Sequence, residues 1–361
     1  MSTLGDVYNM LGEYDESQAI LEEALAAWTE SGSAEDTEYV IILTNLGKTL
    51  EDRGEFDRAQ VHLEKALEVA RRLLPGSQTL LDTLNNLGVL ASYQGDQVRA
   101  AELLQESLRE RKAAGLDRTQ AGATASLNLA TLMQHLDNDA KADSLYRAAL
   151  ALYRELIPAG NAGLVMPLAG YGGYLIHVER WEDAREVLEE ALAICLSAHG
   201  ERHPEVAYTR HNLGAALHGA GRLEEAREQY RESCDQWREF LGRHPYLAAS
   251  LSRQGRLARE TGDPVSAERF HREAWDIRRE FYGDTGEDTI DSRLEVVTAL
   301  REQNRVGDAE GILREMAALT DDDGLPFRSI LTAQLDFYQE QGNEERADEV
   351  RRRVASLPDG T

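Results

Sequence analysis

Small residues recur in this sequence every 41 or 42 residues up to position 297, and no other feature constrains the fold as strongly. A turn-forming residue follows most of these positions after seven residues, and small residues return after twelve and nineteen. Such self-similarity predicts a stacked array of one repeated unit. We name these positions the anchors; they are Gly5, Gly47, Gly88, Ala130, Gly172, Gly214 and Gly255, with divergent equivalents at Val297 and Leu335.

Apolar residues between the anchors recur at steps of three and four, as in Leu46 and Leu50 and then Leu63 and Leu67. This is the period of an amphipathic helix. Each repeat is therefore predicted to be a hairpin of two helices, A and B, which approach closely at their small residues. One hairpin cannot bury its apolar face alone, so neighbouring hairpins must stack. We predict an all-α fold, a right-handed α-solenoid of about nine hairpins over residues 1–357, with a tail at 358–361.

The pattern NLG, then G-x-x-x-x-A, then Ala resembles the tetratricopeptide repeat, although its period exceeds the usual length of about 34 residues. The linkers GERHPEVA, ahead of Gly214, and GRHPYLA, ahead of Gly255, resemble those of the kinesin-light-chain type. In both, a proline stands where it can open helix A at its first turn. The resemblance is good over residues 1–320 and loose over 321–357. It implies that helix A lines a concave face where ligands, usually peptides, lie.

Composition excludes several classes of partner. The chain carries 39 basic and 65 acidic residues, a net charge of −26, which disfavours nucleic acid and anionic membranes. No apolar run approaches the roughly 18 residues of a membrane span. The start of the sequence shows no signal-peptide pattern. Two cysteines in unlike contexts, Cys195 and Cys234, indicate a reducing compartment and free thiols. Together these features lead us to expect a cytoplasmic protein. Arginine greatly outnumbers lysine, and alanine and glycine are abundant, so we expect a bacterial source with a GC-rich genome.

Four asparagines stand two residues before their anchors; they are Asn45, Asn86, Asn128 and Asn212. The resemblance implies that this position hydrogen-bonds the backbone of a bound peptide. A carboxamide offers both donors and an acceptor, which suits an amide ligand of any sequence. The alternative is that these side chains only satisfy a neighbouring helix.

The stretch SRQGRLARE places Arg253, Arg256 and Arg259 at three-residue steps on one broad side of a predicted helix A. Arginine donates two parallel hydrogen bonds to a carboxylate, so this row is a predicted docking site for an acidic or C-terminal carboxylate group. Tyr208 and His211 are expected to contact side chains of the same peptide. The alternative is pairing within the array; its candidate acids are Glu260, Glu295 and Glu302.

Other motifs give little support to catalysis, cofactors or metal. His177, His211 and His218 could suggest zinc, but no HExxH or paired-cysteine motif accompanies them, so we expect no metal site. The glycine-rich stretch around Gly170 lacks the Lys-Ser/Thr of a phosphate loop. The segment TDDDGLPF, residues 320–327, has the wrong spacing for a calcium loop and is expected to be a capping and turn segment before the last repeat. The chain is therefore not expected to be an enzyme or to need a cofactor.

The sequence thus favours a protein-interaction scaffold that binds a peptide or partner segment in its concave groove. One alternative is the sensor or recruitment portion of a larger bacterial signalling protein, whose kinase, protease or nucleotide-switch domain lies outside this chain. Only four residues precede Gly5, whereas helix A of the second repeat is expected to begin at Thr37, ten positions before its anchor Gly47. Helix A of the first repeat is therefore expected to be incomplete. A second alternative is a receptor for a short peptide signal.

Overall fold

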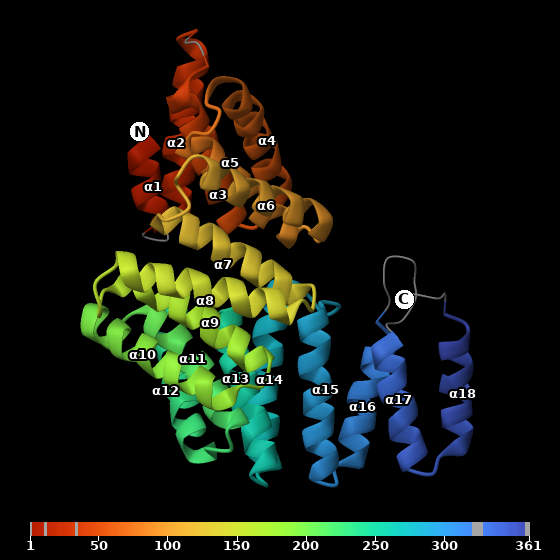
Figure 1. Ribbon diagram of the computed structural model, residues 1–361. Coiled ribbons are helices and arrows are strands. Elements are labelled where there is room, and N and C mark those ends of the chain that lie inside the picture. Colours follow the sequence, from red (N-terminus) through yellow and green to blue (C-terminus); the bar gives the residue numbers. More distant parts are fainter. Residues whose placement is uncertain (1, 11–12, 33–34, 320–327, 358–361) are drawn as a thin grey trace. The chain divides into compact units, whose positions relative to one another are not determined.

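In the computed structural model, the described residues, 2–10, 13–32, 35–319 and 328–357, form eighteen α-helices, one short 3-10 turn and no strand (Figure 1). The predicted all-α fold of helical hairpins is confirmed. The candidate capping segment 320–327 and the tail 358–361 lie outside the described residues. None of the described helices is both long enough and apolar enough to span a membrane.

The chain divides into an N-terminal unit, Met1–Tyr174, and a C-terminal unit, Leu175–Thr361, with the boundary inside α9 (Val165–His177). The N-terminal unit contains α1 (Ser2–Met10), α2 (Tyr14–Glu30), α3 (Thr37–Asp52), α4 (Phe56–Leu73), α5 (Gln78–Tyr93), α6 (Gln97–Ala113), α7 (Gln120–His135), α8 (Asp139–Leu156) and the turn η1 (Ala162–Leu164). The C-terminal unit contains α10 (Trp181–His199), α11 (Pro204–Gly219), α12 (Leu223–Leu241), α13 (Pro245–Glu260), α14 (Pro264–Tyr282), α15 (Glu287–Glu302), α16 (Val306–Met316), α17 (Arg328–Glu340) and α18 (Glu344–Ala355). A single domain over 1–357 stays a prediction.

The anchors are the points where the two helices of a hairpin come closest. A Cβ atom added to Gly47 would lie 2.5 Å from Cγ of Leu63, and one added to Gly214 would lie 2.7 Å from the ring of Tyr230. Real Cβ atoms essentially never lie this close, so a larger residue at Gly47 or Gly214 would force the facing side chain to shift. The large residue that fills the contact comes sixteen positions after the anchor in each case. The repeat register therefore sets the hairpin packing.

The turns inside the hairpins follow the same register. The residue seven positions after the anchor adopts a positive φ in every described repeat, and at Glu179 the angle is 58°. Most repeats use glycine here, which reaches this conformation without steric cost. The departure from glycine at Glu179 thus leaves the turn geometry unchanged.

Candidate functional site

A cavity of about 400 Å³ lies in the N-terminal unit along three successive A helices, α3, α5 and α7. Its lining is polar and includes Asn45 from α3 and Asn85 and Asn86 from α5. We name this cavity the asparagine groove. Two of the four asparagines that the sequence singles out, Asn45 and Asn86, thus line one cavity on the helix-A side of the repeats.

Hydrogen bonds join some of the asparagine carboxamides in and beside the groove to one another. Asn128 of α7 donates to Oδ1 of Asn85 at 3.0 Å, and Asn85 donates to Oδ1 of Asn86 at 3.3 Å. Within the described part of the chain, the carboxamide of Asn45 has no hydrogen-bond partner. Asn128 therefore bonds a neighbouring helix, as the alternative interpretation expects, whereas the donors and acceptor of the Asn45 carboxamide stay unpaired within the described residues.

The floor of the groove holds a residue that the sequence analysis missed. Arg111 of α6 is only 1% exposed and donates to Oδ1 of Asp82 at 2.6 Å. It also donates to Oε1 of Gln78 and to Oγ of Ser107, each at 3.3 Å. A buried guanidinium needs such partners, because leaving the charge uncompensated would be costly. These bonds fix Arg111 beneath the groove.

The repeat spacing could have pointed to Arg111 in the sequence. It follows its anchor by 23 positions, and the equivalents in later repeats each contact a helix A. Tyr153 bonds Thr124 of α7 through its hydroxyl at 2.6 Å, and the ring of Trp237 lies 5.0 Å from that of Tyr246 of α13. We name this register place, 23 positions after the anchor, the floor position; its occupants among the described residues are Trp28, Ala70, Arg111, Tyr153, Cys195, Trp237 and Arg278. Residues at the floor position differ in size and charge, whereas most anchors are glycine.

Two arginines of the predicted row are held within the array. Glu295 of α15 accepts from Nε of Arg256 and from a terminal nitrogen of Arg259, both at 2.9 Å. Arg259 also lies 3.5 Å from Glu302. Glu260, the third candidate acid, instead pairs with Nε2 of His218 at 2.6 Å. Pairing within the array, the alternative interpretation, thus holds for Arg256 and Arg259. Glu260 takes no part in it.

Arg253 differs from its two neighbours, because it has no hydrogen bond or ion pair within the described residues. It lines a cavity of about 210 Å³ formed by α11, α13, α14 and α15, which we name the arginine pocket. Asp288 and Asp291 line the same pocket, so its charge is mixed. Arg278, at the floor position, donates to Oγ of Ser252 at 3.0 Å and is engaged there. Arg253 is therefore the guanidinium of the row that is open to a ligand.

His211 lines the arginine pocket and bonds Oγ of Ser250 at 2.9 Å through Nδ1. Burial, helped by the positive charge of Arg253, lowers the pKa of His211 to about 4, so the ring is neutral at pH 7. Tyr208 is exposed on α11 and is not among the residues lining the pocket, and Asn212 is half-buried on the same helix. The structure therefore does not bring all the predicted contact residues to one cavity.

The tetratricopeptide repeat model matches residues 1–72, 41–113 and 164–239, which together cover more than half of the chain. The chain belongs to the tetratricopeptide repeat family. The matched model describes a repeat and not a catalytic domain.

Curated relatives match part of the chain. Protein KINESIN LIGHT CHAIN-RELATED 2 of Arabidopsis thaliana is 24% identical over 266 residues, which are 72% of this chain and 40% of the relative. The mitochondrial tetratricopeptide repeat protein 19 of Homo sapiens is 26% identical over 97 residues, 27% of this chain and 25% of the relative. The matches thus span less than half the length of these relatives.

Solved structures of tetratricopeptide-type proteins match almost the whole chain. The apo quorum sensor NprR from B. thuringiensis has a TM-score of 0.64 at 15% identity and covers 97% of this chain and 98% of its own. The apo form of RapI has a TM-score of 0.62 at 13% identity; the match covers 98% of this chain and 95% of RapI. At these identities the likeness shows the fold.

Proposed function

We propose that this protein is an interaction scaffold whose asparagine groove binds an extended peptide segment of a partner. The observation that carries the proposal is the carboxamide of Asn45, which lines a groove on three successive A helices without a partner of its own among the described residues. An extended peptide presents amide donors and acceptors at a regular spacing, and side-chain carboxamides match both. Binding through the backbone tolerates many peptide sequences.

As a separate site in the C-terminal unit, we propose that Arg253 binds a carboxylate of a partner peptide, either an acidic side chain or the C-terminus. The arginine row contributes this one free guanidinium, because Arg256 and Arg259 already hold Glu295. A free guanidinium can donate two parallel hydrogen bonds to a carboxylate. The neutral His211 adds a surface without charge to the pocket. Tyr208 and Asn212 on α11 are proposed side-chain and backbone contacts of a bound segment.

A receptor for a short peptide signal is the second candidate function. Solved neighbours include NprR in complex with its cognate peptide NprX, at a TM-score of 0.57 and 15% identity, and a Rap protein complexed with Competence and Sporulation Factor. These ligands belong to those proteins, and they support a peptide as the ligand class here. A role as the recruitment portion of a longer bacterial, cytoplasmic signalling protein fits the same site.

Selection of a displayed peptide library against the full chain tests the proposal. We expect enriched peptides whose dissociation constants rise about tenfold or more, roughly 1.4 kcal/mol, in an Asn45→Ala, Asn86→Ala double variant. Arg253→Ala should weaken peptides with a free carboxylate, at the C-terminus or on an acidic side chain, and leave unchanged the matched peptides in which that carboxylate is converted to an amide. The matched control is Glu102→Ala, an exposed position on α6.

Unchanged affinity in the double variant would contradict the groove, and equal loss for free and amidated peptides would contradict the role of Arg253. Truncating the enriched peptides separates the two candidate functions. A signal receptor retains full affinity for a segment of a few residues, whereas a scaffold loses affinity steadily as the segment shortens.

A further inference from the structure

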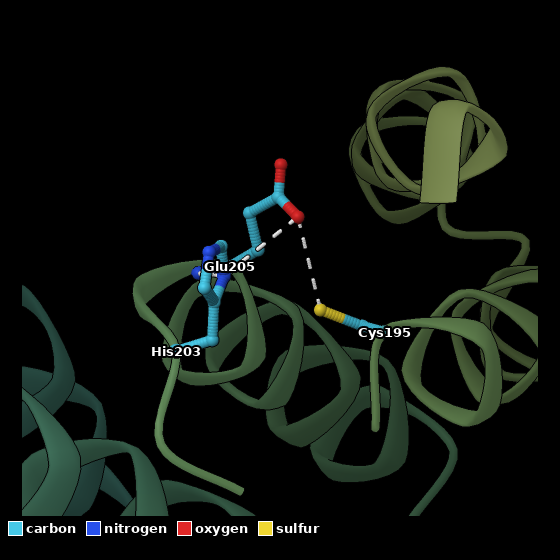
Figure 2. A group of neighbouring side chains, drawn as sticks. All are labelled: Cys195, His203 and Glu205. Atoms are coloured by element: carbon cyan, nitrogen blue, oxygen red, sulfur yellow. Dashed lines mark hydrogen bonds and ion pairs between the residues drawn. The ribbon is translucent and has the colours of Figure 1, made fainter. Parts of the chain in front are cut away.

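The turn between α10 and α11 gathers four side chains that can bind a metal ion. Cys195 and His199 come from the last turns of α10, His203 caps the start of α11, and Glu205 lies in its first turn. Figure 2 shows the carboxylate of Glu205 directed at the sulfur of Cys195 and at the ring of His203. Cys195 occupies the floor position of its repeat.

The distances suit a small cation. Oε2 of Glu205 lies 3.9 Å from Sγ of Cys195, 3.8 Å from Nδ1 of His203 and 3.4 Å from Nε2 of His199. Ligand atoms of Cys195, His203 and Glu205 all lie within 4.8 Å of one another. Two ligands bound to tetrahedral zinc at about 2.0–2.3 Å stand roughly 3.3–3.7 Å apart. Shifts of about 1 Å or less would therefore close the site.

The two histidines are arranged for binding. Their rings stack at a centroid distance of 4.1 Å and an interplanar angle of 14°. Nδ1 of His203 accepts a hydrogen bond from the backbone N–H of Glu205 at 3.3 Å, so this nitrogen carries no proton. A metal ion bound at Nδ1 would take its lone pair and replace this hydrogen bond. The side chains of His199 and Glu205 are 30% and 32% exposed, which leaves a path for an ion from solvent.

The equivalent turn of the next repeat, between α12 and α13, shows that the fold does not require this cluster. It uses the same cap, in which Nδ1 of His244 accepts from the backbone N–H of Tyr246 at 3.3 Å. The places of Cys195 and His199 are taken there by Trp237 and Leu241. The same histidine cap thus forms in both turns, whereas the thiol, the second imidazole and the carboxylate occur together only in the first of the two.

We propose that this turn binds one divalent transition-metal cation of the zinc type, with Cys195, His203 and Glu205 as ligands and His199 as the fourth. Thiolate and imidazole together favour zinc over magnesium or calcium. Binding forms a metal–sulfur bond and releases the thiol proton to solvent. The expectation of no metal site rested on His177, His211 and His218, none of which takes part here. The ion would join the end of α10 to the start of α11.

Titration of the full, untagged chain with Co²⁺ and Zn²⁺, after treatment with a chelator, tests the site. We expect tetrahedral Co²⁺ bands with a thiolate-to-cobalt charge-transfer absorption, and one Zn²⁺ per chain in competition with a chromophoric chelator. Cys195→Ser should abolish the charge-transfer band and weaken Zn²⁺ binding at least tenfold. Cys234→Ser, which changes a second buried free thiol in the same unit, is the matched control and should alter neither result.

His199→Leu, which installs the residue found at this place in the next turn, keeps the test decisive if Cys195→Ser fails to fold. It should weaken Zn²⁺ binding and keep the charge-transfer band, because the thiolate remains. The lack of that band in the wild-type chain, or unchanged Zn²⁺ affinity in a folded Cys195→Ser variant, would overturn the proposal. The cluster would then be a thiol–carboxylate hydrogen bond beside a helix cap.

Discussion

His271 in α14 is fully buried, and neither of its ring nitrogens has a hydrogen-bond partner in the described structure. It packs against Gly255 at the register place that holds Leu63 and Leu104 in earlier repeats. Leaving buried polar atoms unsatisfied costs free energy of folding. Burial also lowers the pKa of His271 to about 4, with the negative charge of Glu295 opposing the shift.

We predict that His271→Leu raises the free energy of unfolding at pH 7 by about 1–2 kcal/mol, because it removes two unsatisfied nitrogens. The folded-state pKa lies below the ordinary value of 6.5, so the unfolded chain binds more protons between these values, and stability falls as the pH drops from 6.5 towards 4. The variant should show a smaller fall. Urea unfolding at pH 7 and pH 5 measures both effects.

The remaining acid sensitivity of the variant should come partly from His211, whose pKa is lowered in the same direction. A variant that is less stable than wild type at both pH values would show that the ring of His271 contributes packing that leucine cannot replace.

At the scale of the element, the close approach of the two helices decides which glycines can be replaced. A Cβ at Gly214 would meet the ring of Tyr230 at 2.7 Å, whereas a Cβ at Gly311 in α16 would meet nothing within 4 Å. Both glycines lie inside helices, where alanine is intrinsically favoured by about 1 kcal/mol. Substitution by alanine gains helix propensity at both sites, but only at Gly214 does it also disturb the packing of the hairpin.

We predict opposite signs for the two alanine substitutions. Gly214→Ala should lower the free energy of unfolding by about 1–3 kcal/mol, since overpacking outweighs propensity. Gly311→Ala should raise it by roughly 0.5–1 kcal/mol. Denaturant unfolding of both variants checks this pair. If both substitutions stabilise the protein, the anchors are not the points that set the helix separation.

At the scale of the molecule, the main helix contacts join elements that are adjacent or two places apart in the chain, as in α11 with α12 and α13. Stability in such an array is close to a sum of repeat and nearest-neighbour terms. A local change should therefore have local consequences, and the two units can be probed separately.

We predict that Gly214→Ala increases amide hydrogen exchange in α11–α14 and leaves α3–α6 unchanged. Exchange followed by mass spectrometry on the full chain measures this directly. The same experiment on Gly311→Ala provides the control, with protection retained in both regions. A uniform rise along the chain after Gly214→Ala would show that the array unfolds as one cooperative body.

The helices, their pairing and their turns were predictable from the sequence, because each repeat has the same spacing of apolar, small and turn-forming residues. Apolar spacing specifies helix, the anchor glycine specifies close contact, and the residue seven places later specifies the turn. Glu179 shows how robust this register is, since the turn forms there without glycine. Local periodicity thus determined the fold class.

Tertiary structure decided which predicted residues meet. Asn45 and Asn86 line one groove, whereas Arg256 and Arg259 are occupied by Glu295, more than 35 positions away in the chain. The convergence of Cys195 with its neighbours also depends on how two helix ends are oriented across a turn. Sequence spacing gives the face on which a side chain lies, but its partner depends on distances between helices, which only the packed structure fixes.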